Sequence, residues 1–300
     1  MQRRQLIHST GLAAAGLALA GCAQKNWGAP PAGAAARAER FQQGIRRIEA
    51  ASGGGRLGVA LRDTGSGEQW LYRGEERFPM CSTFKLVAAA LVLARVDRGE
   101  ERLERRIAVL PGRVVANSPV TQARAGGAPM SLAELCEAAI TLSDNTAGNL
   151  MLESFGGPAQ LTAYTRTLGD GSFRLDRWET ALNEALPGDP RDTTTPAAMV
   201  ATLRRLALED ALSPTSRAQL IAWLRGNKTG GQRLRAQLPA GWTVADKTGS
   251  GDRGTTNDIG VLWPPGRAPL PAVCYLTGST LDAAGRDQVM AAVGRVLAEG

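Results

Sequence analysis

Residues 82–96, Ser-Thr-Phe-Lys-Leu-Val-Ala-Ala-Ala-Leu-Val-Leu-Ala-Arg-Val, predict an apolar helix that begins with a serine and a lysine and stops at Gly99. Ser82 and Lys85 are three residues apart, so a helix places both side chains on one face. The N-terminus of a helix also stabilises the negative charge that develops when a serine attacks a carbonyl. Lys85 could take the proton of Ser82 or, if protonated, make that proton easier to remove. This stretch therefore predicts a nucleophile at the start of a helix.

The base that serves this serine has to be a lysine or a carboxylate. The only histidine of the chain, His8, lies inside an apparent export signal, so we expect none in the mature protein. A chain without histidine cannot form a Ser-His-Asp triad or an imidazole metal site. No Cys-x-x-Cys spacing is present either, and we predict neither a metal nor a cofactor. Three cysteines remain after Cys22, and we interpret Cys81, directly before Ser82, as a buried packing residue.

A second polar motif is Ser143-Asp144-Asn145, which follows a predicted helix opened by the capping box Ser131-Leu-Ala-Glu134. We expect this motif to lie on the turn into the next helix. Its hydroxyl could carry a proton and its amide could hold a substrate amide, although the same tripeptide is also an ordinary helix cap.

A third motif lies in a long loop, at about residues 176–196, that shows no regular period. Long ordered loops are usually functional. Glu179 and Asn183 within it would supply a carboxylate and an amide to one water, which is what a general base with a positioning group requires. Arg177 and Asp192 bracket the loop, and we predict an ion pair between them that pins its base.

The fourth motif, Lys247-Thr248-Gly249, ends a predicted strand, where a glycine lets a ligand approach the backbone. The same tripeptide occurs at residues 228–230 without a strand around it, and we interpret that copy as a coincidental turn. Each motif alone is weak, but their order and predicted contexts together indicate one active site.

Strands are predicted at both ends of the chain, with helices between them. The predicted strands are residues 56–62, 68–73, 242–251, 255–263 and 271–278. The predicted helices are residues 38–51, 82–96, 131–142, 146–155, 196–208, 216–225 and 282–299. This pattern favours a layered α+β domain, built from residues 38–76 and 228–300, with an all-helical domain from residues 77–227 that carries Ser82, Ser143 and the long loop.

The N-terminus is typical of an exported protein. Arg3-Arg4 and the apolar run that follows fit a twin-arginine signal peptide over residues 1–21. Leu-Ala-Gly before Cys22 resembles a lipoprotein box, which predicts lipidation of Cys22; an ordinary signal with a chance cysteine is the alternative. Residues 22–37 are predicted to be a flexible tether. We therefore expect a periplasmic protein, lipid-anchored if Cys22 is modified, whose net charge of +7 without basic runs does not indicate nucleic-acid binding.

Taken together, the four motifs resemble those of the class A β-lactamases. The resemblance runs from about Ala38 to the C-terminus and includes the residues that flank the motifs. The flanking sequences are Phe-Pro-Met-Cys-Ser-Thr-Phe-Lys around Ser82, Ala-Ala-Ile-Thr-Leu-Ser-Asp-Asn-Thr-Ala around Ser143, and Arg-Trp-Glu-Thr-Ala-Leu-Asn around Glu179. It implies the fold of β-lactamases and DD-peptidases, a five-stranded antiparallel sheet flanked by helices plus the all-helical domain.

The resemblance also implies roles in a two-step acyl transfer. Ser82 would attack the lactam carbonyl, with Lys85 or Glu179 as its base, and Ser143 would protonate the leaving nitrogen. The backbone N–H groups of Ser82 and Ser250 would form the oxyanion hole. Glu179 and Asn183 would then activate the deacylating water. Substrate-binding roles are implied for Asn117, Asn145, Asn183, Arg233, Lys247, Thr248, Gly249 and Ser250.

The chain departs from this family at several positions. Many relatives have an arginine where Thr256 stands, and Arg233 is the expected substitute. Gly251 stands where some carbapenem-hydrolysing relatives place a cysteine that pairs with the one equivalent to Cys81. Cys81 therefore lacks that partner, and the sequence leaves carbapenem hydrolysis open. We predict a monomeric serine β-lactamase acting on penicillins and cephalosporins. The alternatives are a penicillin-binding DD-peptidase, a serine esterase and a non-catalytic wall-binding lipoprotein; Glu179 and Asn183 favour hydrolysis.

Overall fold

The structure is a computed structural model that describes residues 33–299. Its five-stranded sheet has the order β2-β1-β9-β8-β7, and every neighbouring pair is antiparallel. The strands are β1 (Arg56–Arg62), β2 (Gln69–Tyr72), β7 (Thr243–Gly251), β8 (Thr255–Trp263) and β9 (Leu270–Thr277). Pairing of β1 with β9 brings the two ends of the chain together in one sheet. The predicted α+β class and the five antiparallel strands are therefore confirmed.

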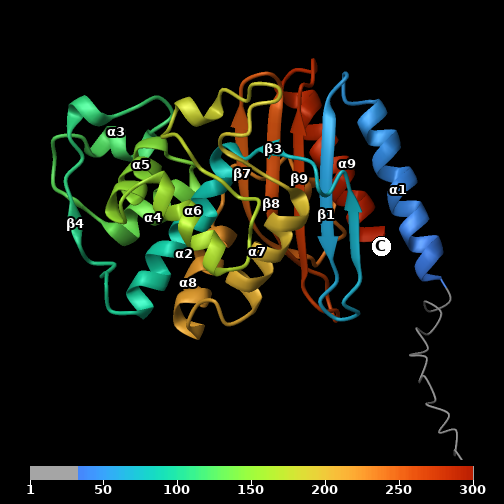
Figure 1. Ribbon diagram of the computed structural model, residues 1–300, viewed down its shortest axis with the longest axis horizontal. Helices are drawn as coiled ribbons and strands as arrows, with labels where there is room; N and C mark the ends of the chain where they lie inside the picture. The colour runs from blue at the N-terminus through green and yellow to red at the C-terminus, as the bar shows by residue number, and fades with distance from the viewer. Residues whose placement is uncertain (1–32, 300) are drawn as a thin grey trace, which may run out of the picture.

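Helices cover both faces of this sheet (Figure 1). Helices α1 (Ala34–Ala50) and α9 (Ala283–Glu299) lie side by side on one face, and α7 (Pro196–Leu208) packs on the other. Burial along the interior strand β8 is continuous from Thr255 to Leu262. A strand can be buried at successive positions only when both faces of its sheet are covered, which is the situation here.

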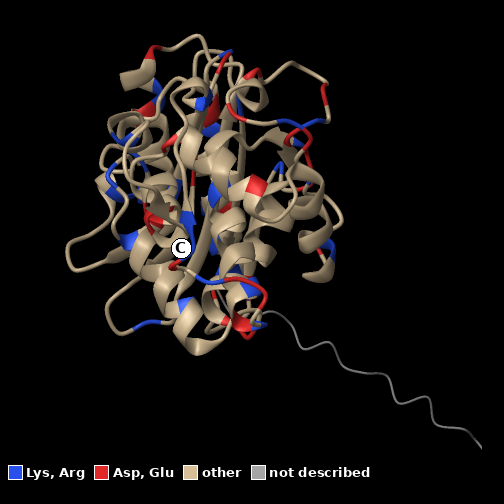
Figure 2. Ribbon diagram, turned by 90° about the vertical axis from the view of Figure 1, so that its left-hand side faces the viewer, with Lys and Arg blue, Asp and Glu red and all other residues tan. Residues whose placement is uncertain are grey.

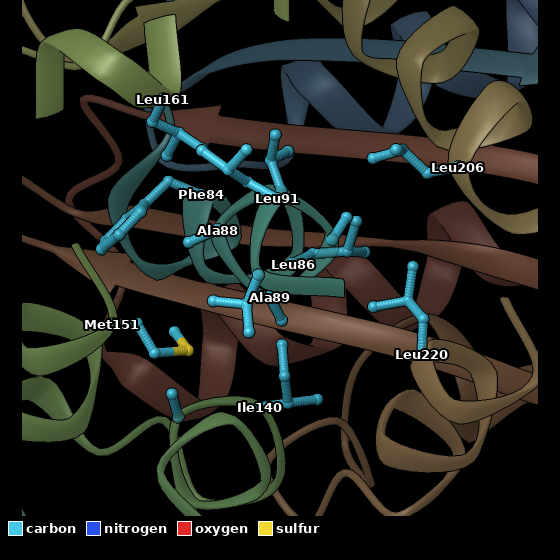
Figure 3. Packing of buried hydrophobic residues seen from close by; sticks show 14 of the residues in the cluster. Phe84, Leu86, Ala88, Ala89, Leu91, Ile140, Met151, Leu161, Leu206 and Leu220 are labelled. Carbon is cyan, nitrogen blue, oxygen red and sulfur yellow. The ribbon is translucent and has the colours of Figure 1, made fainter. Parts of the chain in front are cut away.

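Beside the sheet lies a cluster of helices around α2 (Phe84–Asp97), which we call the helical part. Every residue of α2 from Phe84 to Ala94 is buried, as expected for a helix that is apolar all round. Figure 3 shows side chains from neighbouring helices gathered around it. These helices are α4 (Leu132–Thr141), α5 (Asn145–Ser154), α6 (Pro158–Thr167), α7 and α8 (Pro214–Arg225). The opening stretch of the sequence thus forms the centre of the helical part.

The buried apolar side chains form two clusters, one between the sheet and α1 and α9, and one between the sheet and the helical part. The division of the chain into two domains after residues 76 and 227 stays a prediction. No helix in the described range is long and apolar enough to cross a membrane. Acidic and basic residues are interspersed over the face shown in Figure 2.

Local signals placed several helix ends correctly. Ser131 caps α4 through its hydroxyl, which accepts from the N–H of Glu134 at 3.1 Å, and the Glu134 carboxylate accepts from the N–H of Ser131 at 2.6 Å. The predicted capping box is therefore confirmed. Thr195 and Pro196 likewise begin α7 as predicted.

Other boundaries differ from the prediction. Ser82 lies in a 3₁₀ turn, η1 (Cys81–Thr83), and the α-helix begins only at Phe84. Helix α8 begins two residues earlier than expected, because Ser213 caps it and Pro214 occupies its first turn. Helix α1 begins at Ala34, so residues 34–37 of the predicted tether are helical. Helix α6, a short helix α3 (Pro119–Arg124) and three further 3₁₀ turns were not predicted. These turns are η2 (Pro111–Arg113), η3 (Ala181–Asn183) and η4 (Leu234–Gln237).

Two short ladders were also not predicted. Strand β3 (Phe78–Pro79) pairs with β6 (Thr193–Thr194), and β4 (Arg106–Ile107) pairs with β5 (Met130–Ser131). The β3–β6 ladder joins the segment before Ser82 to the end of the long loop. It therefore helps to position that loop against the nucleophile.

Candidate active site

The four motifs meet at a cavity of about 610 Å³ between strand β7 and the helical part. Its lining residues are Ser82, Asn117, Ser118, Pro119, Gln122, Leu142, Ser143, Asn145, Asn183, Thr229, Arg233, Thr248, Gly249 and Ser250. Three charged side chains of the predicted site, Lys85, Glu179 and Lys247, are buried beside this cavity. The structure thus brings together residues that are far apart in the sequence.

Ser82 is held by two potential bases. Its Oγ lies 2.9 Å from Lys85 Nζ and donates to Glu179 Oε1 at 3.2 Å. Cys81, just before it, has a φ of 46°, a left-handed conformation that is rare for residues other than glycine. Strand β7 passes close by, since a Cβ on Gly249 would lie 2.8 Å from Met80 O and 3.2 Å from Ser82 N. Only glycine allows the strand to approach the nucleophile in this way.

Lys85 is fully buried and contacts four oxygens. Its Nζ lies 2.9 Å from Ser82 Oγ, 2.9 Å from Ser143 O, 2.6 Å from Asn145 Oδ1 and 2.9 Å from Glu179 Oε1. A lysine nitrogen offers at most three N–H donors, so it cannot give each of these four oxygens a proton of its own. This arrangement connects the serine, the polar turn and the carboxylate through one nitrogen.

Glu179 is fixed by two asparagines. Its Oε2 accepts from Asn183 Nδ2 at 2.6 Å, which brings the predicted carboxylate and amide together. Asn149 of α5 binds both backbone groups of Glu179, accepting from its N–H at 2.9 Å and donating to its carbonyl at 2.9 Å. The Glu179–Thr180 peptide bond is cis. Asn149 was not predicted, although its position four residues after Asn145 places both on one face of α5.

The predicted ion pair at the base of the long loop is present. Arg177 Nε lies 2.5 Å from Asp192 Oδ2, and the Asp192 side chain is 1% exposed. Asp192 Oδ1 also accepts from the N–H groups of Asp176 and Arg177, at 2.8 and 2.9 Å. Arg177 binds Glu184 Oε2 at 2.7 Å as well. One buried carboxylate therefore closes the loop that carries Glu179.

Ser143 and Lys247 form a second close pair of a serine and a lysine, after Ser82 and Lys85. Lys247 Nζ donates to Ser143 Oγ at 3.0 Å. Complete burial lowers the pKa of Lys247 well below the usual lysine value, and the charge of Lys85 lowers it further. Asp144 has a structural role, because its carboxylate caps α5 through the N–H of Ala147 at 2.8 Å and accepts from Thr121 Oγ1 at 2.7 Å.

Asn145 and Asn117 lie at the opposite wall of the cavity. Asn145 Nδ2 donates to Ala116 O at 2.9 Å, which leaves one amide hydrogen for a ligand. The carbonyl of Asn117 accepts from the Asn145 N–H at 3.0 Å, and Asn117 has a φ of 57°. Backbone bonds therefore hold both residues at the rim.

The far end of the cavity is cationic. Arg233 donates through Nη1 to the carbonyls of Gly249 and Asn257, at 2.9 and 2.8 Å, and through Nη2 to Ser250 Oγ at 2.8 Å. Asp287 holds its Nε at 2.8 Å. Arg233 is the expected substitute for the arginine that many relatives have where Thr256 stands. It lies beside the last residues of strand β7.

The interpretation of residues 228–230 as a coincidental turn was wrong for its middle residue. Thr229 lines the cavity, and its hydroxyl contacts the hydroxyl of Thr248. Asn227 Oδ1 accepts from the N–H of Thr229 at 3.0 Å and so fixes the turn. The sequence could not place this turn, because its position depends on packing against the distant strand β7.

The cysteines have no part in this chemistry. Cys81, Cys136 and Cys274 are buried and unpaired within the described chain. Burial raises the pKa of the Cys81 thiol, with a smaller effect of the Glu179 charge, so the thiol stays protonated. This agrees with its interpretation as a packing residue. No group of side chains in residues 33–299 has the composition of a metal site.

Comparison with known proteins supports the geometry. Residues 40–299 match the β-lactamase enzyme family. The chain is 51% identical to β-lactamase OXY-1 of Klebsiella oxytoca and 50% identical to β-lactamase CTX-M-8 of Citrobacter amalonaticus, in each case over 88% of this chain and 90% of the relative.

Solved structures agree with this result. An ancestral class A β-lactamase is 62% identical with a TM-score of 0.85, over 86% of this chain and 99% of that chain. A putative class A β-lactamase, PenP from Rhodopseudomonas palustris, is 59% identical with a TM-score of 0.84, over 86% of this chain and 98% of that chain. The chain therefore belongs to the β-lactamase enzyme family, and within it to class A.

Proposed function

We infer that this protein is a serine β-lactamase that hydrolyses the lactam amide of penicillins and cephalosporins through an acyl-enzyme on Ser82. The observation that carries this conclusion is the contact of Ser82 Oγ with both Lys85 and Glu179, while Glu179 also binds Asn183. A nucleophile with an adjacent base explains acylation, and a carboxylate with a positioning amide explains hydrolysis of the ester.

Acylation begins when Ser82 Oγ attacks the lactam carbonyl and loses its proton. Lys85 Nζ and Glu179 Oε1 are both within hydrogen-bond reach of this oxygen, so the geometry serves either base, the carboxylate directly or through a water. The N–H groups of Ser82 and Ser250 stabilise the oxyanion. Loss of one such donor typically lowers the rate by about 10²–10³-fold.

The lactam nitrogen then needs a proton to leave. Ser143 Oγ donates it and recovers one from Lys247, whose Nζ lies 3.0 Å away. The lowered pKa of Lys247 favours this transfer. Asn145 Nδ2 binds the side-chain amide of the substrate, and the cationic end of the cavity, with Lys247, Thr248, Ser250 and Arg233, binds its carboxylate.

Deacylation distinguishes a β-lactamase from a DD-peptidase. A water between Glu179 and the ester loses a proton to the carboxylate and attacks the acyl carbon. The bond between the acyl carbon and Ser82 Oγ then breaks, and Glu179 returns the proton to Ser82 Oγ, which lies 3.2 Å away. Asn183 orients this water and Asn149 keeps the backbone of Glu179 in place. A stable acyl-enzyme, as in a DD-peptidase, would have no need of this arrangement.

The test is turnover of a chromogenic cephalosporin by the mature domain, with intact-mass analysis of the same mixture. We expect many turnovers by the wild type, and a persistent adduct on Ser82 in Glu179→Gln. Glu153→Gln is the matched control, because Glu153 lies outside the loop and its side chain is 49% exposed. One equivalent of product with a lasting adduct in the wild type would instead mean a DD-peptidase. No product and no adduct would mean a non-catalytic protein.

We further propose that the protein works as a periplasmic monomer, lipid-anchored through Cys22. The signal, the Cys22 motif and most of the tether lie outside the described residues, so this proposal rests on the sequence alone. Mass spectrometry of membrane-extracted protein tests it: an acylated N-terminal cysteine is expected, and cleavage elsewhere would refute the anchor.

A further inference from the structure

A second cavity, of about 340 Å³, lies behind the long loop. Its walls come from loop residues 185–191, from the start of β1, from β3 and from the turn between β7 and β8. It shares no lining residue with the catalytic cavity. It is therefore a site distinct from the substrate site.

The lining of this cavity is strongly basic. Five arginines contribute to it, and Asp189 is the one carboxylate among its lining residues. The arginines are Arg56, Arg77, Arg177, Arg191 and Arg253. We call this cavity the basic pocket.

Three of the five arginines are neutralised by carboxylates. Arg56 binds Glu76 at 2.9 Å, and Arg191 binds Asp189 at 2.6 Å. Arg177 binds Asp192 and Glu184, as described above. These three guanidinium groups therefore add little net charge.

Arg77 and Arg253 are different, because within residues 33–299 they bind only neutral acceptors. Arg77 donates through Nη1 to Ser172 O at 2.8 Å and to Thr193 Oγ1 at 3.1 Å. Arg253 donates through Nη1 to Glu184 O at 2.6 Å. Two positive charges are thus left without a counter-charge in one cavity, and each guanidinium has further N–H groups to offer.

We propose that the basic pocket binds a small phosphate-bearing anion through Arg77 and Arg253. A guanidinium matches phosphate oxygens with paired N–H donors, and two guanidiniums match the two charges of a phosphate. The cavity is larger than a free phosphate needs, and Leu182, Ala185 and Pro187 give it an apolar wall. It therefore has room for the small organic body of a phosphomonoester.

Binding there would brace the loop that carries Glu179. Arg77 contacts the end of the loop at Thr193, and Arg253 contacts its middle at Glu184. A bound anion adds a link between these two points and stabilises the folded loop by mass action. This consequence for catalysis rests on the proposed function, whereas the binding itself does not.

The test is a titration of the mature domain with inorganic phosphate, followed by backbone amide NMR, against sodium chloride at equal ionic strength. Gly188 and Gly278 report on the basic pocket, and Gly249 and Ser250 report on the catalytic cavity, which is also cationic. We expect saturable, phosphate-specific shifts at Gly188 and Gly278. Their absence, or shifts confined to Gly249 and Ser250, would overturn the proposal, whatever the hydrolytic activity.

Arg77→Gln and Arg253→Gln test the two ligands separately. We expect each to weaken phosphate binding at Gly188 and Gly278 by about tenfold or more, and to leave the response of Ser250 unchanged. Arg106→Gln is the control, because Arg106 is 64% exposed and lies outside the pocket. Equal affinity in all three variants would refute the assignment. If a variant does not fold, the wild-type titration alone decides.

A parallel titration with glycerol 3-phosphate distinguishes between two ligands, free phosphate and a phosphomonoester. Tighter binding than inorganic phosphate would show that the apolar wall takes part and that the ligand is a phosphomonoester. Equal or weaker binding would identify free phosphate as the ligand. A response to neither compound would overturn the proposal.

Discussion

The substitution Asp192→Asn would break the closure of the long loop with almost no change in shape. Asp192 is buried, and its carboxylate accepts from Arg177 Nε and from two backbone N–H groups. Asparagine can still accept the two backbone bonds through its oxygen, but its amide N–H₂ then faces the Arg177 guanidinium. Two donors would meet where a buried ion pair now lies.

The expected cost follows from this geometry. Removing one partner of a buried ion pair typically costs about 3–5 kcal/mol, since the remaining charge stays buried without compensation. Because the two backbone bonds survive and Arg177 keeps Glu184, we expect the lower end, about 3 kcal/mol. For a domain of this size, each kcal/mol lowers Tm by about 2–4 °C, so the midpoint should fall by about 6–12 °C.

Thermal and urea unfolding of the mature domain measure this change. Glu153→Gln is the matched control, because it breaks the Arg113–Glu153 pair, in which both side chains are about half exposed (47% and 49%). Such pairs contribute about 0–1 kcal/mol. Asp192→Asn should also slow deacylation, since the loop that positions Glu179 loosens. A Tm equal to that of the control would refute our account of the loop.

Three further results are expected. Gly251→Ala would place a Cβ 2.6 Å from Cys81 Sγ and 2.7 Å from Asn183 O, so it should lower the free energy of unfolding in urea by about 1–3 kcal/mol and lower kcat. A stability and a kcat equal to those of the wild type would contradict this contact. Because burial lowers the pKa of Lys247, its ammonium should lose its proton at a pH below the usual lysine range, and KM for a carboxylate-bearing substrate should rise over that pH range. A rise in KM that begins only at the usual lysine pKa would contradict this. The three buried thiols should react with a thiol reagent only in denaturant, and fast labelling of the native protein would contradict their burial.

The parts of the fold that follow from local chemistry were predictable. The apolar run from Phe84 gives the central helix, and the Ser131–Glu134 box gives the start of α4. Alternation and turn residues placed the five strands, because these signals act within a few residues of the backbone they shape.

The parts that depend on distant partners were not predictable. The two-residue strands β3 and β6 have no signal of their own, and each exists only because the other is adjacent. Thr229 likewise reaches the cavity only because β7 lies next to its turn. Asn149 is the intermediate case, since helical spacing from Asn145 indicates its face but not its contact with Glu179.

The choice of cations gives a further argument for the site. The chain contains four lysines among 35 basic residues, so nearly all its positive charge is carried by arginine. Two of those lysines, Lys85 and Lys247, are fully buried beside Ser82 and Ser143. Arginine keeps its proton in proteins, whereas a buried lysine can release one. A chain that otherwise uses arginine thus has lysines beside both of these serines. At Lys247, whose pKa is lowered by burial, this favours proton transfer over simple charge stabilisation.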